Sequence, residues 1–277
     1  MSGAHRARIA AALAGDGAAR LAALAEIGAL APGEAAALVD AALAAAVVET
    51  LASPSRSEQR LAAETMAPLA NALPAIEHAL DAALDDPRQR LRWGAAFTLG
   101  RARASRPGRL WPATREAMAL HDGDQRWAAT ELATRLARAD DEVADGLREA
   151  AGDDSPVLRR MALYGLRDLA APDLGDAARQ ALEDVDAKVR LAALAALVAA
   201  PGDDSQRARS AVLVASRVAA DPDPGVRRAA AATLGRLGVS LPEVTTALAA
   251  AAESTDEALA RAALAAGRQL GGEPAAR

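Results

Sequence analysis

The chain has 277 residues, a net charge of −5 at neutral pH and no cysteine. Without cysteine it has neither disulfides nor thiol chemistry, and its acidic balance argues against a dedicated nucleic-acid binder. Hydrophobic residues make up 52% of the sequence but aromatic residues only 2%, so a core must be built from closely packed small and aliphatic side chains.

The first predicted element is a helix over residues 5–14. This segment superficially resembles a signal peptide, but its apolar part is short and merges into the pattern that follows, so we expect a helix of the fold. The longest uncharged apolar run, residues 191–200, is far too short to span a bilayer. We therefore expect a cytoplasmic protein with no membrane association.

A helical phrase then recurs along the whole chain, at steps that average about 34 residues. Each copy carries a marker residue, which we define as the arginine near the start of a helix that in most copies follows an apolar residue. The markers are Arg20, Arg60, Arg92, Arg126, Arg159, Arg190 and Arg227, with Ala260 in the last copy. Steps that are longer than the average are expected to hold loop insertions.

Each copy reads as helix, tight turn, helix. The turn is rich in Asp and Pro, which cap a helix and fit its first turn, so we expect Asp186 and Asp223 to cap second helices or to bind marker arginines. First helices are expected to open after apolar-Pro steps such as Leu73-Pro74, Trp111-Pro112 and Leu241-Pro242.

This repeating helix–turn–helix pattern predicts an all-α fold. We expect a right-handed α-α superhelix of about eight helix pairs in a single domain over residues 1–277. Four aliphatic residues of the clearest copies are expected to be buried between repeats: Val189, Leu197, Val226 and Leu234.

Residues 223–235 read Asp-Pro-x-Val-Arg-x-Ala-Ala-x-x-x-Leu-Gly. This phrase resembles the HEAT repeat, in the bacterial version called HEAT-like or phycobilisome-lyase-type, and the resemblance covers essentially the whole chain. It implies that marker arginines bind turn carboxylates of a neighbouring copy and that second helices line the concave side. Such repeats serve in scaffolds, adaptors, chromophore lyases and a few DNA-repair glycosylases, so the resemblance specifies the fold and leaves the function open.

Four of the five aromatic residues fall on matching places of successive second helices. Aligning the copies places Leu61, Trp93, Trp127 and Arg160 at one position, and Thr65, Phe97, Glu131 and Tyr164 four residues later. Residues four apart share one face of a helix. We therefore expect Trp93, Phe97, Trp127, Glu131, Arg160 and Tyr164 to form one binding patch, with the alternative that the rings fill space between alanines.

A basic segment surrounds this predicted patch. Residues 87–138 contain eleven arginines and four acidic residues. Four of these arginines, in a stretch with Pro and Gly, are expected to form an exposed loop at the rim of the patch: Arg101, Arg103, Arg106 and Arg109. Such a loop suits an acidic partner surface or phosphates, although a merely solvated loop explains it as well.

Three functional hypotheses follow. The first is a non-catalytic scaffold that binds a protein partner with aromatic and arginine anchors. The second is a nucleic-acid enzyme similar to the HEAT-like alkylpurine DNA glycosylases, in which Glu131 would be the acid, although that family normally uses an aspartate. The third is an accessory protein for a chromophore or small molecule, resembling phycobilin lyases.

No cofactor or metal is expected. The three histidines, at positions 5, 78 and 121, lie far apart without ligand spacing. No nucleophile–base pair, phosphate loop or catalytic carboxylate pair is evident in the sequence, so the scaffold is the preferred hypothesis and no residue is expected to be catalytic unless the glycosylase resemblance extends to Glu131.

Overall fold

The computed structural model describes residues 3–102 and 106–271. These residues form seventeen α-helices and one short 3-10 helix, and no strand occurs among them. The all-α fold predicted from the repeats is thus confirmed. The contacts divide the chain into two compact units, Met1–Ala144 and Asp145–Arg277, and the prediction of a single domain stays a prediction.

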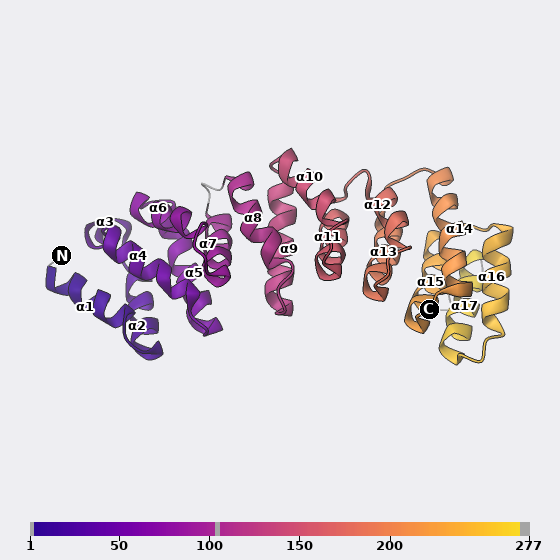
Figure 1. The fold of residues 1–277 in the computed structure, drawn as a ribbon, viewed down its shortest axis with the longest axis horizontal. Helices are drawn as coiled ribbons and strands as arrows, with labels where there is room; N and C mark the ends of the chain where they lie inside the picture. Colours follow the sequence, from indigo (N-terminus) through magenta and orange to yellow (C-terminus); the bar gives the residue numbers. More distant parts are fainter. Residues whose placement is uncertain (1–2, 103–105, 272–277) are drawn as a thin grey trace. The chain divides into compact units, whose positions relative to one another are not determined.

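Unit 1 is built from two layers of helices. One layer contains α2, α5, α7 and α9 in succession, and α4 and α6 pack side by side in the other (Figure 1). The bounds in chain order are α1 Gly3–Leu13, α2 Gly17–Gly28, α3 Pro32–Leu38, α4 Ala41–Glu49, η1 Thr50–Ala52, α5 Arg56–Ala70, α6 Pro74–Ala83, α7 Gln89–Arg101, α8 Pro107–Ala117 and α9 Gly123–Ala137.

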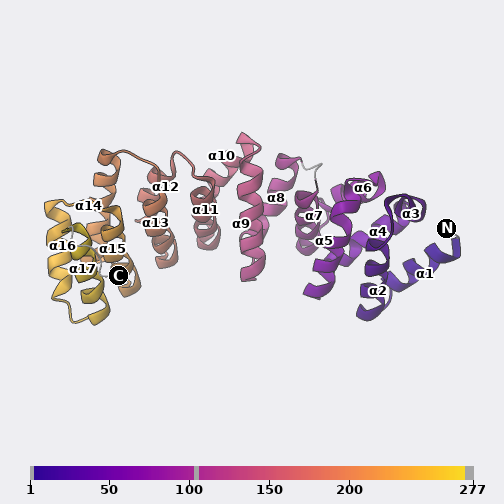
Figure 2. The same ribbon diagram turned by 180° about the vertical axis from the view of Figure 1, so that it is seen from behind.

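Unit 2 repeats this arrangement. The second helices α11, α13, α15 and α17 pack in succession, and α12, α14 and α16 form the layer beside them, as the view from behind also shows (Figure 2). The boundary between the units falls inside α10, Asp141–Ala150. The remaining helices are α11 Pro156–Leu169, α12 Leu174–Ala181, α13 Ala187–Ala199, α14 Asp204–Ala220, α15 Pro224–Leu237, α16 Pro242–Ala252 and α17 Glu257–Leu270.

The core between successive second helices is aliphatic and rich in alanine. Val189, Val226 and Leu234 are completely buried, and Leu197 is nearly so, which confirms the four positions expected between repeats. Because alanine buries little area, these helices gain stability from close approach rather than from large side chains.

The Asp-rich turns cap the second helices as predicted. The Asp186 carboxylate accepts hydrogen bonds from the amides of Lys188 and Val189, and the Asp223 carboxylate accepts one from Val226. Each cap satisfies amides that the first turn of a helix leaves without partners.

The marker arginine holds its own turn and the next repeat together through one guanidinium. In α13, Arg190 Nη1 donates to the carbonyl oxygens of Asp184 and Val185, at 2.8 and 3.2 Å. Its Nε and Nη2 donate to the Asp221 carboxylate at 2.8 and 2.7 Å. The same fork joins two further pairs of residues, Arg92 with Glu116 and Arg159 with Asp184. Arg20 makes a simpler version, in which Nε alone donates to Glu58 and Nη1 donates to the Gly15 carbonyl.

The carboxylate that accepts this fork is not the capping aspartate. Asp184 and Asp221 lie two residues before the caps Asp186 and Asp223, and each also accepts a hydrogen bond from the amide of its cap. In the turns before α13 and α15 the first aspartate therefore serves as the junction between copies, and the second caps the helix. In unit 1 the acceptors Glu58 and Glu116 lie in the helices α5 and α8 instead.

The structure corrects the register of one copy. In α5 the residue at the marker position is Gln59, whose side-chain amide donates to the Ser53 carbonyl at 2.6 Å, as marker arginines do to the residue six places before them. The prediction of Arg60 as a marker was one residue too late, because Arg60 is exposed and pairs with Glu64 on the helix surface.

Two other local expectations were wrong. The long steps contain helix rather than loop insertions, since α3 is an additional helix and α14 is lengthened to 17 residues. The Trp111-Pro112 step does not open a helix either: α8 begins at Pro107, and Pro112 lies in its interior.

Breaking the most buried fork should destabilise unit 2 strongly. Arg190 and Asp221 expose 6% and 0% of their side chains, so Arg190→Met leaves a buried carboxylate without its counter-charge, at a cost of about 3–5 kcal/mol. The double variant Arg190→Met/Asp221→Leu removes both charges and should recover most of this loss. Urea denaturation measures the free energy of unfolding of both variants. The control is Arg261→Met, which removes the exposed pair with Glu257. If Arg190→Met were no less stable than this control, the stabilising role of the Arg190–Asp221 pair would be contradicted.

The fork also predicts a pH dependence. Burial by itself raises the pKa of Asp184, but hydrogen bonds from Arg159 and the Asp186 amide, with the nearby arginine charges, hold this pKa below its ordinary value. A carboxyl whose folded pKa is lowered stabilises the fold above its unfolded pKa of about 3.9, and this contribution is lost as pH falls through the folded pKa.

Asp184→Asn should therefore be less stable than the parent chain at pH 7. Its stability should also change less than that of the parent between pH 5 and pH 2. Urea midpoints across this range test the prediction, with Glu257→Gln as the surface control. Parallel curves for the parent chain and Asp184→Asn would refute it.

Candidate binding surface

A hollow of about 390 Å³ opens on the second-helix layer of unit 1. The floor lies on α7, and the two walls come from α5 and α9. We call this feature the aromatic hollow. It is lined by Arg56, Gln59, Arg60, Trp93, Phe97, Asp122, Asp124, Gln125 and Ala128.

The floor of the aromatic hollow consists of two rings one helical turn apart. The ring centroids of Trp93 and Phe97 are separated by 5.4 Å at an interplanar angle of 50°, a tilted geometry that favours aromatic pairs. Trp93 is 8% exposed and Phe97 is partly exposed. Phe97 is thus partly open to solvent, whereas most of Trp93 is packed, and the role of either ring in binding a partner stays a prediction.

Two glycines allow α7 to lie close to its neighbours. A Cβ on Gly94 would lie 2.7 Å from Cβ of Leu51, and a Cβ on Gly100 would lie 2.5 Å from a methyl group of Leu132. A larger residue at Gly94 would push η1 away from α7, because Cβ of Leu51 cannot move by rotation of its side chain. At Gly100 the Leu132 side chain would have to move. These two positions therefore allow the close packing of α7 against η1 and α9.

An ion pair joins the walls at one end of the aromatic hollow. Arg56, the first residue of α5, reaches past α7 to both Asp122 and Asp124, with its Nη1 3.1 Å from the Asp124 carboxylate. Asp122 also caps α9 by accepting from the amides of Asp124 and Gln125. The beginnings of α5 and α9 are thus held together above the floor.

Trp127 and Glu131 lie on α9 but do not line the aromatic hollow. Trp127 is 50% exposed, although it is the largest kind of apolar side chain, and Glu131 is exposed one turn further along. With the corrected register, the residues of α5 that align with Trp127 and Glu131 are Arg60 and Glu64, in place of the predicted Leu61 and Thr65. Thr65 is buried and corresponds to the buried Thr98 of α7.

The other two residues of the predicted patch belong to unit 2. Arg160 and Tyr164 are partly exposed on α11, and the guanidinium of Arg167 lies 5.2 Å from the centroid of the Tyr164 ring. Their union with Trp93, Phe97, Trp127 and Glu131 in one patch stays a prediction.

The predicted basic loop divides into separate roles. Arg101 ends α7 and lies 5.6 Å from the Phe97 ring centroid, so it is close to the aromatic floor. Arg109 belongs to α8 and binds Asp85, and its hydrogen bond lowers the pKa of that carboxyl below the ordinary value. Arg106 lies 4.0 Å from both Glu77 and Asp81. Arg103 is outside the described residues.

The sequence predicts Arg106 and Arg109 in an exposed loop at the rim of the patch, but in the structure both lie close to carboxylates. Their charges are largely matched by the acidic residues of α6 and of the turn after it. This local matching could not be foreseen from the net charge of the segment, because the acids lie before its first residue.

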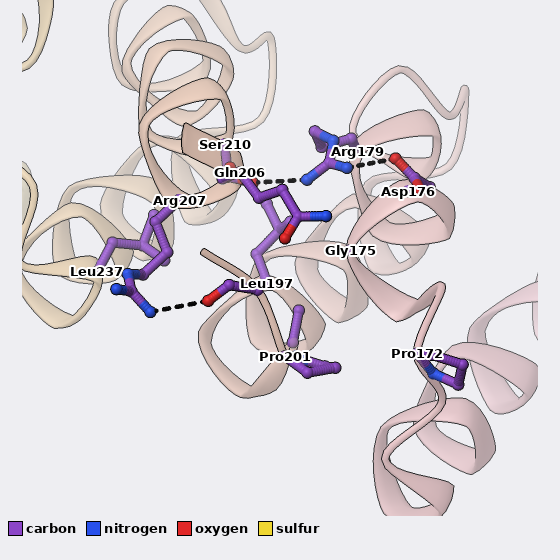
Figure 3. Close-up of a pocket in the computed structure, with 12 residues that line it drawn as sticks. Pro172, Gly175, Asp176, Arg179, Leu197, Pro201, Gln206, Arg207, Ser210 and Leu237 are labelled. Carbon is purple, nitrogen blue, oxygen red and sulfur yellow. Dashed lines mark hydrogen bonds and ion pairs between the residues drawn. The ribbon is translucent and has the colours of Figure 1, made fainter. Parts of the chain in front are cut away.

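A second, much smaller gap lies in unit 2 between α12, α13 and α14 (Figure 3). Arg179 crosses it from α12, paired with Asp176 and hydrogen-bonded to Ser210 of α14, while Arg207 donates to the Gly202 carbonyl. Its volume of about 20 Å³ is close to the space that one water needs. The gap is thus a feature of packing and has no room for an organic ligand.

Within the described ranges, no three His, Asp or Glu side chains are grouped so that they could hold a metal ion. In the same part of the chain, no single helix is long and apolar enough to cross a bilayer. The bent pair formed by α3 and residues 41–52 meets the length and composition criteria only when its two helices are combined.

Comparison with solved structures identifies the fold. Kap121p, a karyopherin solved with the extreme C-terminus of the protein phosphatase Cdc14p, has a TM-score of 0.63 and 14% identity over 91% of this chain. Importin beta has a TM-score of 0.57 and 16% identity over 93% of this chain. YibA of E. coli has a TM-score of 0.51 and 16% identity over 90% of this chain. The chain spans 32% of Kap121p and 40% of importin beta, but 96% of YibA.

Sequence comparison matches one segment of the chain. Residues 175–267 match the family described as HEAT repeats, and no curated protein sequence matches the chain significantly. The matched segment lies in unit 2, and the arginine forks and capped turns of unit 1 repeat the same construction. The bacterial variant of the repeat stays a prediction. Residues 175–267 are thus HEAT repeats by sequence, and the remaining helix pairs share the same helical-solenoid architecture.

Proposed function

We propose that this protein is a non-catalytic scaffold that binds a protein partner, with the second-helix layer of unit 1 as its main contact surface. The observation that carries this proposal is the half-exposed ring of Trp127 on the helix that also forms a wall of the aromatic hollow. Trp and Arg are enriched among the residues that dominate binding energy at interfaces.

The distribution of large side chains supports the proposal. Each repeat has the same need for packing, and most are filled by alanine, leucine and valine. Trp93 and Phe97 exceed this need, because together they form the floor of an open hollow rather than a closed core. The packing alternative explains the buried part of Trp93 but leaves the exposure of Trp127 without a function.

The fold is typical of protein-binding scaffolds, since stacked helix pairs supply extended surfaces. Kap121p, which shares this fold, has been solved with a peptide end of another protein. We carry over from it only the general mode, in which a segment of a partner lies on a row of second helices.

Truncating Trp127 should weaken partner binding without unfolding the chain. Because half of the ring is exposed, Trp127→Ala removes little core packing, whereas an interface anchor of this type contributes about 2 kcal/mol or more. The measurement is the amount of partner captured from nuclease-treated lysate of the source cells by the immobilised full chain, followed by titration of the identified partner.

The matched control is Leu264→Ala, since Leu264 is also about half exposed, at 51%, but lies on α17. Equal loss of the partner with both variants would contradict the assignment to unit 1. Material that is lost on nuclease treatment would favour nucleic acid, and release of bases from alkylated DNA that disappears with Glu131→Gln would identify a glycosylase instead.

A further inference from the structure

The arginines around the aromatic hollow fall into two groups. Arg56 is matched by Asp122 and Asp124, and Arg60 is matched by Glu64 in the same helix. Arg101 and Arg135, in contrast, form no ion pair with any residue in the described ranges. Both are exposed, and each lies in the last turn of its helix.

These two guanidiniums lie at the same end of the aromatic hollow. Arg101 extends over the Phe97 ring, and Nη2 of Arg135 lies so close to α7 that a Cβ on Gly100 would be 3.4 Å from it. Gly100 and Arg101 are adjacent in α7. The end opposite the Arg56 ion pair therefore carries two guanidinium groups that form no ion pair with a carboxylate among the described residues of unit 1.

The position of these charges is not explained by the helix ends alone. A cation in the last turn of a helix interacts favourably with its dipole, by about 0.3–1 kcal/mol. This interaction leaves the hydrogen-bond donors of a guanidinium available, and a guanidinium fork fits a carboxylate in a bidentate manner. An aromatic floor next to two available guanidinium groups can thus bind an apolar side chain and, beside it, a carboxylate.

We propose, resting on the function proposed above, that the aromatic hollow receives an apolar side chain of an extended peptide segment of the partner. Arg101 and Arg135 bind a carboxylate of the same segment. Arg101 follows Phe97 by four residues and Trp93 by eight, about 6–12 Å along the helix. An extended peptide rises about 3.3 Å per residue, so the carboxylate lies two to four residues from the apolar side chain.

The charges on the walls favour a peptide over a nucleic acid. A nucleic-acid strand places a phosphate at every nucleotide, so it would have to pass Glu64, Asp124 and Glu131, all exposed on the same helices. A peptide with one apolar side chain and a localised acidic group avoids these residues and meets positive charge only at the far end.

The test is fluorescence anisotropy with the full chain and a labelled nonapeptide of Gly and Ser that contains one Phe and, three residues later, two consecutive Glu. One comparison peptide replaces the Phe with Ala, and another replaces both Glu with Lys. A labelled oligothymidylate of twelve nucleotides serves as the nucleic-acid probe. We expect the Phe-Glu peptide to bind at least tenfold more tightly than each of these three probes.

Charge reversal separates a local effect from misfolding. Arg101→Glu/Arg135→Glu should weaken binding of the Glu peptide at least tenfold and should bind the Lys peptide more tightly than the parent chain does. Arg236→Glu, an exposed arginine of α15, is the matched control and should leave both affinities unchanged. A double variant that has unfolded cannot gain affinity for the Lys peptide, so this gain is the decisive readout.

Three results would overturn the proposal: equal binding of the Glu and Lys peptides, tighter binding of the oligothymidylate, or an unchanged Glu-peptide affinity in the double variant. These failures are distinct from failure of the scaffold function. If a protein partner is still captured through Trp127 while the peptide preference is missing, the surface binds proteins but not by this acidic contact.

Discussion

The forked arginine is the interaction on which the rest of the structure depends. One guanidinium fixes the turn of its own repeat through carbonyl oxygens and at the same time holds a carboxylate of the next repeat. The geometry satisfies three or more donors of a planar group that is always charged, which a lysine could not reproduce. A chain so rich in alanine has little side-chain area with which to set the spacing of its helices, and the fork sets it instead.

The distribution of these forks is uneven. Arg190 and Asp221 form the most buried pair, whereas the other forks are partly open to solvent. A buried ion pair of this kind adds little to the free energy of unfolding compared with apolar residues in its place. Removing one partner, however, lowers that free energy strongly, because the other charge stays buried without a counter-charge. Its value in a repeat protein lies in register, because sliding one helix pair past the next would leave both charges without partners.

Much of the fold was predictable because its signals are local. The capping aspartates and the aliphatic residues at helical spacing identify the second helices from the sequence alone. One error arose where two adjacent residues competed for one position, because Gln59 makes the marker bond without being an arginine and Arg60 follows it. Another arose because the apolar-Pro step at Trp111 has the pattern of a helix start, although α8 begins at Pro107.

The candidate surface was predictable only in outline. Its aromatic residues could be aligned by register, but the contact between Arg56 and Asp122, which joins the walls of the aromatic hollow, spans 66 positions of sequence. The difference between Arg109, which is neutralised, and Arg135, which is not, also depends on which helix each faces. Such matching is a property of packing, and no spacing in the sequence encodes it.

The replacement of a marker arginine by Gln59 has a further consequence for α5 and α7. A neutral amide cannot supply the charge-assisted bond that joins other copies, so the walls of the aromatic hollow are tied mainly by Arg56, whose side chain is 66% exposed. Dissolved ions screen exposed charges over about 10 Å at 0.1 M salt and affect buried pairs much less. The shape of this one surface is therefore tied to the ionic strength of its surroundings, while the buried pair in unit 2 is insulated from it.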